Sequence, residues 1–366
     1  MTTINARRAR WAAVTTVVLG MLIVSACSSS SSSTSSTPSG GNTSSSSSSS
    51  LSGTLNGSGS TFQTNFQQAA ISGFKSVDSG ITVNYGGGGS GKGRTDLAGG
   101  VVNFAGSDSP IPTSEQANFK GKTVLYFPVI VGPITMSYNL SGVTNLKLTP
   151  TVIAGIFQGK ITSWNNSAIK SLNPGANLPS SAITLAVRSD SSGTTANFSL
   201  FLEKSAGSAW TLGSSSTINW PSTAHAASGN SGVAQVIKST PGAIGYVDYS
   251  TAKATGLSFA SVKNKAGSYI APSDASATAS AETATVAPDL TFHAVWGSNA
   301  NAYPITYQSW DLVYAKQPNA NDAAMLKAYL GYLLGPGQQL LSSLSYAPLP
   351  ASIDSMAKAQ LSKITS

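Results

Sequence analysis

The chain has 366 residues, of which 40% are hydrophobic and 9% are charged, and its formal net charge is +8. It contains one cysteine and two histidines, so an intramolecular disulfide and a zinc site built on thiolates are excluded. Beyond the first ten residues the basic side chains form no run, which argues against nucleic-acid binding. We therefore expect a fold held together by burial, with no cofactor and no catalytic metal centre.

The first 26 residues have the pattern of a secretory signal peptide. Three arginines within the first ten residues precede an apolar stretch from Trp11 to Val24, which is too short and too weakly apolar for a comfortable membrane span. The sequence Val-Ser-Ala-Cys at residues 24–27 resembles the bacterial lipobox, so we expect Cys27 to carry the lipid. The alternative is a free cysteine beside an ordinary cleavage site. Loss of the signal arginines leaves 18 basic and 13 acidic residues, a net charge of +5.

Residues 27–50 are almost pure serine and threonine, with nothing apolar to bury. Such a segment is expected to act as a disordered, flexible tether between the lipid and a folded body that begins near Leu51. The low charge of the body is typical of an extracytoplasmic bacterial protein. Its roughly 315 residues exceed the usual size of one core, so we expect two lobes.

Within the body, strand-like apolar runs alternate with helical stretches, which predicts a mixed α/β fold. Thr149 followed by Pro150 marks the start of a helix over residues 149–158. The other expected helices span residues 61–74, 193–202, 232–238, 323–334 and 353–364. The expected strands span residues 81–85, 183–187 and 243–249, with one or two more within residues 124–136.

Four short segments rich in glycine and serine lie where a strand passes into a helix. The free N–H groups of a helix amino terminus suit an anion, serine and threonine add hydroxyl donors, and glycine allows close approach of the backbone. Taken singly, each segment is equally explained as the cap at the start of an ordinary helix. The segments are Gly57–Phe62, Gly86–Ser90, Gly106–Pro110 and Arg188–Thr194.

Residues 86–93 nearly match the phosphate-binding loop of nucleotide hydrolases. Lys92 occupies the lysine position, but Gly93 stands where a serine or threonine would hold magnesium. We therefore do not expect nucleotide hydrolysis.

In chain order, these segments resemble the motifs of the phosphate-binding proteins that serve bacterial high-affinity phosphate ABC transporters. Residues 57–62 match the family's glycine-rich turn before Thr-Phe, and residues 102–110 match its Val-Asp-Phe-Gly-Ala-Ser-Asp-Ala-Pro segment. Residues 188–194 match its hallmark Arg-x-Asp-x-Ser-Gly-Thr sequence. Further similarity, at residues 156–175, 241–247, 303–306 and 344–350, extends the resemblance over nearly all of the body.

Three features depart from the family pattern. Lys92 and Arg94 stand where the family commonly has small or aliphatic residues, and we expect both side chains to be solvated; the alternative is that they raise the local positive potential. Residues 266–288 have the composition of a variable insert.

The resemblance implies a two-lobe periplasmic-binding-protein fold, in which two mixed α/β domains are joined by two crossover strands. Lobe I would take residues 51–127 and 303–366, and lobe II would take residues 128–302. Phosphate would bind in the cleft between them.

The resemblance also implies which groups donate hydrogen bonds to phosphate. Thr61 and Phe62 would donate backbone N–H groups, and Ser90 would donate through its hydroxyl and its amide. The start of the helix after the arginine loop would supply the rest, from Ser192, Gly193 and Thr194.

Three charged residues complete the implied site. Arg188 would bind the anion directly, and Asp190 would orient Arg188 without touching the ligand. The alternative for Asp190 is that it only braces its own loop. Asp108 would accept the proton of hydrogenphosphate or dihydrogenphosphate, whereas sulfate carries no proton at neutral pH and would be repelled. The plain alternative for Asp108 is a helix cap before Pro110.

The function that the resemblance implies is a monomeric receptor, lipid-anchored to the outer face of the cell membrane, that binds inorganic phosphate and delivers it to an ABC permease. The alternatives are a secreted phosphatase-like enzyme and a phosphate-sensing or adhesion lipoprotein on the same fold. Because neither His225 nor His293 lies in a recognisable catalytic motif, we expect no enzyme.

Overall fold

The structure is a computed structural model that describes residues 51–366. The predicted signal peptide, the predicted lipid attachment at Cys27 and the predicted serine-rich tether lie outside the described residues. Within residues 51–366, no helix combines the length and the hydropathy that a membrane crossing requires.

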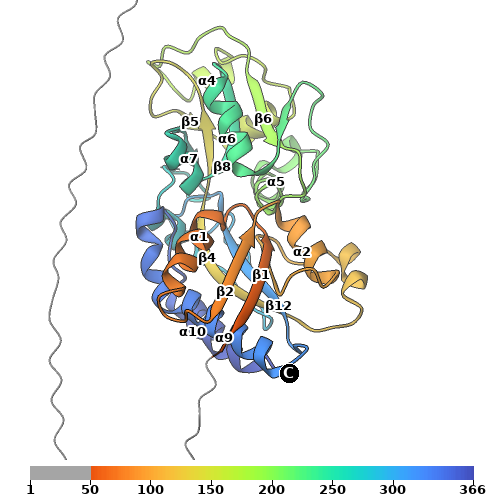
Figure 1. The fold of residues 1–366 in the computed structure, drawn as a ribbon. Helices are drawn as coiled ribbons and strands as arrows, with labels where there is room; N and C mark the ends of the chain where they lie inside the picture. Colours follow the sequence, from red (N-terminus) through yellow and green to blue (C-terminus); the bar gives the residue numbers. More distant parts are fainter. Residues whose placement is uncertain (1–50) are drawn as a thin grey trace, which may run out of the picture. The chain divides into compact units, whose positions relative to one another are not determined.

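A mixed sheet extends through the described part of the chain, and strand β4 (Val124–Tyr138) connects its two halves (Figure 1). The strand order is β2-β1-β3-β12-β4-β8-β6-β7. β4 first pairs antiparallel with β12 (Thr306–Tyr314) and then with β8 (Ala243–Asp248). All residues of β4 after the first are buried, as expected of a strand covered on both faces. We call the half that contains β1, β2, β3 and β12 the first lobe, and the half that contains β6, β7 and β8 the second lobe.

Two prolines in β4 lie where its pairing is irregular. Pro128 pairs with Trp310 of β12, next to the register shift between Ser309 and Trp310. Pro133 is the last residue to pair with β12, and the next residue, Ile134, already pairs with β8. Proline has no N–H to donate to a sheet, so it is tolerated at bulges and where pairing ends.

The first lobe places three loops at one edge of the sheet. Its strands β1 (Gly53–Gly59), β2 (Ile81–Gly86) and β3 (Phe104–Ser107) are parallel, and β3 pairs with β12. Because parallel strands end at the same edge, the segments that follow β1, β2 and β3 meet there. The main helices of this lobe are α1 (Thr64–Phe74), α2 (Ser90–Ala98), α9 (Ala320–Leu334) and α10 (Ala351–Gln360).

The second lobe repeats this arrangement. β6 (Thr184–Arg188) is parallel to β7 (His225–Ala227) and to β8, so the loops after β6 and β7 also share an edge. The main helices are α3 (Pro150–Phe157), α5 (Gly193–Ala206), α6 (Gly229–Ser239) and α7 (Tyr249–Thr255).

Residues 266–288, expected as a variable insert, contain β11 (Tyr269–Ile270) and α8 (Asp274–Ala281). Ser273 and Ser276 form a reciprocal cap at the start of α8, and Ala277 and Ala281 are buried in the core. The remaining short elements are β5 (Lys147–Leu148), β9 (Ser258–Phe259), β10 (Ser261–Lys263), α4 (Ser167–Lys170) and the 3₁₀ turns Thr113–Phe119, Gly207–Ala209, Pro336–Leu340, Ser342–Leu344 and Leu361–Lys363.

Every predicted helix and strand is present, with shifted ends. Thr149 caps α3 through its side chain, which accepts a hydrogen bond from the N–H of Val152, as the sequence predicted. α1 begins at Thr64, three residues later than expected, because residues 61–63 form the turn that enters the helix. Residues 124–136, expected to hold one or two strands, form the single strand β4.

Candidate functional site

The four glycine- and serine-rich segments meet where the loops of the first lobe face α5 of the second lobe. Three of them follow β1, β2 and β3, and the fourth follows β6 and leads into α5. Direct hydrogen bonds join the two sides, including one from the N–H of Gly91 to the carbonyl of Ser191 (3.0 Å). The strand ends therefore bring the predicted segments to one place.

Asp108 lies at the centre of this arrangement and is only 2% exposed. Its Oδ1 accepts hydrogen bonds from the hydroxyls of Ser60 (2.5 Å) and Ser309 (2.6 Å). Its Oδ2 accepts only a long one, from the hydroxyl of Ser90 (3.3 Å). Burial raises the pKa of Asp108, while the bonds from Ser309 and Ser60 and the charge of Arg188 act in the opposite direction.

Ser90 connects Asp108 to the second lobe. Its hydroxyl oxygen accepts hydrogen bonds from the N–H of Asp108 (3.1 Å) and from the N–H of Gly193 (3.2 Å), the first residue of α5. A Cβ on Gly193 would overlap the Ser90 hydroxyl and the Asp108 side chain. This approach of the two lobes therefore requires glycine at position 193.

Arg188 is buried and is held by a two-pronged ion pair with Asp190. Its Nε donates to Oδ1 of Asp190 (2.8 Å), and a terminal nitrogen donates to Oδ2 (2.5 Å). The other terminal nitrogen reaches the side chains of Thr194 (3.4 Å) and Asn230 (3.2 Å). Burial alone would raise the pKa of Asp190, but the hydrogen bonds and charge of Arg188 hold it below its ordinary value. Asp190 also accepts from the N–H of Gly229 (3.0 Å), which fixes the pair to the start of α6.

Thr61 and Thr194 approach each other through Asn230. The hydroxyl of Thr61 accepts from the N–H of Asn230 (3.3 Å), and the hydroxyl of Thr194 accepts from the Asn230 side-chain amide (3.4 Å). Thr61 belongs to the first lobe, whereas Thr194 and Asn230 begin α5 and α6 of the second. These contacts place both predicted threonines beside Arg188.

The polar groups of Phe62 and Ser192 take part in bonds within the fold. The N–H of Phe62 donates to the hydroxyl of Ser60 (3.1 Å). The hydroxyl of Ser192 caps α5 by accepting from the N–H of Thr195 (3.2 Å), and its N–H donates to the carbonyl of Ser216 (2.9 Å). In this structure the predicted anion-binding groups are thus bonded to one another and to their neighbours.

Sequence reasoning missed three residues of the site: Ser60, Asn230 and Ser309. Ser60 belongs to the predicted Gly57–Phe62 segment, so its hydroxyl could have been recognised from the sequence as a candidate hydrogen-bonding group of the site. Asn230 and Ser309 belong to no recognised motif, and they reach the site only because α6 and β12 pass beside it.

The expectation that Lys92 and Arg94 are both solvated is correct for Lys92 and wrong for Arg94. Lys92 is exposed and pairs with Asp96 along α2. Arg94 is fully buried, because it makes a two-pronged ion pair with Glu115 (2.6 and 2.9 Å) and donates to the hydroxyls of Ser107 (3.2 Å) and Ser109 (3.1 Å). These two serines flank Asp108, so Arg94 supports the loop that carries it.

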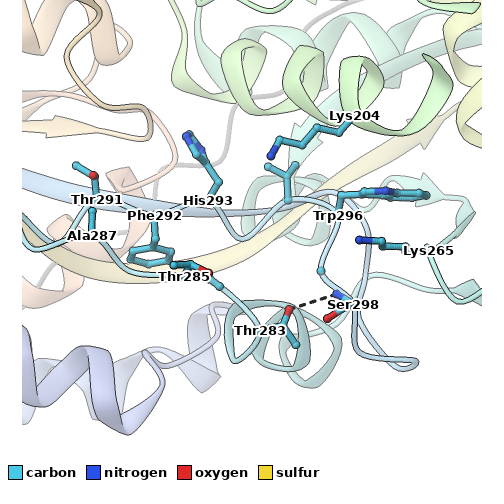
Figure 2. Close-up of a pocket in the computed structure, with 13 residues that line it drawn as sticks. Lys204, Lys265, Thr283, Thr285, Ala287, Thr291, Phe292, His293, Trp296 and Ser298 are labelled. Atoms are coloured by element: carbon cyan, nitrogen blue, oxygen red, sulfur yellow. Dashed lines mark hydrogen bonds between the residues drawn. The ribbon is translucent and has the colours of Figure 1, made fainter. Parts of the chain in front are cut away.

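A separate cavity of about 460 Å³ lies beside His293, and none of the predicted phosphate-binding residues lines it (Figure 2). Its walls include Lys204, Lys265 and Trp296, and none of its lining residues within the described chain is an aspartate, glutamate or cysteine. Desolvation and the charge of Lys204 lower the pKa of His293. Across residues 51–366, no cluster of three or more histidine, cysteine, aspartate or glutamate side chains is suited to a metal ion.

A family model described as a PBP superfamily domain matches residues 44–336 of the chain. Phosphate-binding protein PstS3 of Mycobacterium bovis (strain BCG / Pasteur 1173P2) is 34% identical over 307 residues, which cover 81% of this chain and 83% of the relative. PstS 3 of Mycobacterium leprae is 35% identical over 312 residues, covering 82% and 84%. PstS of Pasteurella multocida is 33% identical over 315 residues, covering 84% and 89%.

Solved structures of phosphate-binding proteins share the fold. One from Stenotrophomonas maltophilia has a TM-score of 0.70 at 21% identity, over 84% of this chain and 93% of its own. The high-affinity periplasmic protein PfluDING, bound with phosphate, has a TM-score of 0.69 at 22% identity, over 84% and 94%. The predicted two-lobe periplasmic-binding-protein fold is therefore confirmed. Together with the relatives above, these matches show that the chain belongs to the PstS phosphate-binding protein family of the PBP superfamily.

Proposed function

We propose that this protein binds inorganic phosphate between its two lobes and delivers it to an ABC permease. The observation that carries the proposal is the uneven bonding of the buried Asp108 carboxylate. Oδ1 is occupied by two serine hydroxyls, whereas Oδ2 has one long contact and lies against Gly193 at the junction of the lobes. An acceptor of this kind suits an anion that carries its own proton.

The charges around Asp108 support the same choice of ligand. Arg188 supplies a buried positive charge, and the starts of α5 and α6 direct N–H groups toward the same region. In the proposed complex, phosphate replaces some of the bonds that these groups now make with one another. Phosphate contacts come from Thr61, Phe62, Ser90, Asp108, Arg188, Ser192, Gly193 and Thr194, and Asp190 orients Arg188.

Selectivity follows from protonation. Hydrogenphosphate and dihydrogenphosphate donate a hydrogen bond to Oδ2 of Asp108, whereas sulfate leaves two negative groups facing each other in a buried site. A buried acceptor without a donor costs about 1–3 kcal/mol, and more for charged groups. Sulfate is therefore rejected by the same carboxylate that retains phosphate.

The relatives are named as binding proteins, and we propose that this chain is likewise a receptor and not an enzyme. We further propose removal of residues 1–26, lipid attachment at Cys27 and a location at the outer face of the cell membrane. The lobe boundaries proposed are residues 51–127 with 303–366 for one lobe and 128–302 for the other.

Isothermal titration of the purified protein with phosphate and with sulfate tests the proposal. The expected result is phosphate binding at micromolar or lower concentration, with no competition from sulfate in excess. Comparable affinity for both anions would overturn the role of Asp108. Turnover of a chromogenic phosphate ester that depends on Arg188 would instead favour the phosphatase-like alternative.

A further inference from the structure

Tyr307 has a buried hydroxyl for which the described residues provide no hydrogen-bond partner. The residue is fully buried in β12, two positions before Ser309. Successive side chains alternate along a strand, so Tyr307 and Ser309 share a face of β12. Since the Ser309 hydroxyl donates to Asp108, Tyr307 lies on the face of the strand that carries the site.

The pairing of β4 defines the surroundings of Tyr307. Tyr307 lies opposite Gly132, and the ring of Phe62 occupies the space above this glycine, stacked on Tyr307 at a centroid distance of 4.1 Å. On the other side of β4, Asp248 lies opposite Ile134, two residues along and therefore on the same face. Asp248 is fully buried, and its Oδ2 also has no partner among the described residues.

The environment keeps the Tyr307 hydroxyl protonated. Burial, followed by the charges of Asp248 and Asp108, raises its pKa well above the ordinary value, and the nearby Thr194 hydroxyl only partly opposes this. Tyr307 is thus a hydrogen-bond donor at any physiological pH. It lies close to one residue of the site from each lobe: Phe62, on which it stacks, and Thr194, whose hydroxyl influences its pKa.

We propose that the Tyr307 hydroxyl donates a hydrogen bond to an oxygen of the bound phosphate, which makes Tyr307 a further ligand residue, supplied by strand β12 of the first lobe. This inference rests on the proposed function. A buried tyrosine hydroxyl normally finds a partner, and leaving one unpaired is costly. A phosphate oxygen is a strong acceptor, and a donor on β12 would bind it from a central strand of the sheet, independently of the loops.

The experiment compares Tyr307→Phe with Tyr303→Phe in calorimetric titrations with inorganic phosphate. Tyr303 is the matched control, since it is equally buried and its hydroxyl already donates to the carbonyl of Ile134 (3.0 Å). We expect Tyr307→Phe to weaken phosphate binding about tenfold, which corresponds to about 1.4 kcal/mol for a hydrogen bond to a charged group. We expect Tyr303→Phe to leave the affinity unchanged.

Thermal unfolding provides the second readout. Without phosphate, Tyr307→Phe should match or exceed the melting temperature of the wild type, because it removes an unpaired buried hydroxyl, whereas Tyr303→Phe should melt lower. With phosphate, the ligand-induced rise in melting temperature should be smaller for Tyr307→Phe only. Unchanged phosphate affinity of Tyr307→Phe, with normal binding by the wild type, would overturn this inference and leave the proposed function standing. Absence of phosphate binding by the wild type would overturn both.

Discussion

The N–H of Gly193 donates a hydrogen bond to the hydroxyl of Ser90, and this bond links the start of α5 in the second lobe to the start of α2 in the first. It is possible because Gly193 has no side chain. Any Cβ at this position would occupy the space of the Ser90 hydroxyl and the Asp108 carboxyl group.

Gly193→Ala should therefore prevent the lobes from approaching this closely. We expect phosphate affinity to fall at least about tenfold, since the loss of one or more hydrogen bonds to the anion costs more than about 1.4 kcal/mol. Titration calorimetry measures the loss, and small-angle X-ray scattering with saturating phosphate should show a larger radius of gyration than the wild type. Gly331→Ala, in helix α9, is the control, because a Cβ there meets only the side chain of Leu361, at 3.8 Å. Equal affinities for wild type and Gly193→Ala would contradict the close approach.

Asp108→Asn tests the carboxylate itself. An asparagine oxygen can still accept from Ser60 and Ser309, but an N–H₂ group replaces Oδ2 and cannot accept a proton from phosphate. We expect phosphate affinity to fall roughly 10- to 100-fold, the cost of losing a hydrogen bond to a charged group. Sulfate affinity should rise, so the ratio of the two dissociation constants is the decisive measurement. A variant that still excludes sulfate would show that selectivity has another source.

Arg94→Met tests the buried support of the Asp108 loop. The substitution leaves Glu115 without its partner and removes donors to Ser107 and Ser109. Because Glu115 is 28% exposed and can regain water, we expect a loss of about 2 kcal/mol of stability, below the 3–5 kcal/mol typical of a fully buried broken pair. Urea denaturation gives the value. Lys92→Met, on the exposed side of the same helix, should change stability by less than about 0.5 kcal/mol.

The pH dependence of stability should contain a contribution from Asp311. Burial raises the pKa of this carboxyl group to about 7, although Gln67 and Gln63 partly oppose the shift. The folded state then holds a proton that the unfolded state releases at lower pH, so this contribution to stability is complete below about pH 4 and is lost as the pH rises to about 7. Asp311→Asn mimics the protonated form. We expect its stability relative to wild type to increase between pH 4.5 and 7.5, by up to a few kcal/mol in denaturant titrations. A constant difference across this range would show that Asp311 does not titrate there.

The sequence predicted the site residues best where a local motif also marks the end of a strand. Ser90, Asp108 and Arg188 were predictable because each lies at the end of a buried apolar run beside glycine or serine, and a shared sheet edge brings such ends together. The cap formed by Thr149 was predictable for the same reason, since the signal lies within four residues.

The rest depends on contacts between distant segments. Ser309 lies 201 residues from Asp108, and its register on β12 is set by a bulge that no local pattern reveals. The burial of Arg94 depends on Glu115, 21 residues away in a short 3₁₀ turn, so its charge alone suggested a solvated side chain. Asn230 reaches Arg188 because β7 directs the start of α6 toward the loop after β6.

The change of pairing partner within β4 has a mechanical consequence. A strand shared by two bodies transmits bending between them, and the easiest place to bend is where the fewest hydrogen bonds must stretch. β4 passes from β12 to β8 between Pro133 and Ile134, and Pro133 has no N–H to be strained there. When one lobe rotates against the other about Pro133, no hydrogen bond donated by this residue has to break. β4 can thus bend at this point, while its pairing with β12 on one side and with β8 on the other keeps the rest of the strand straight.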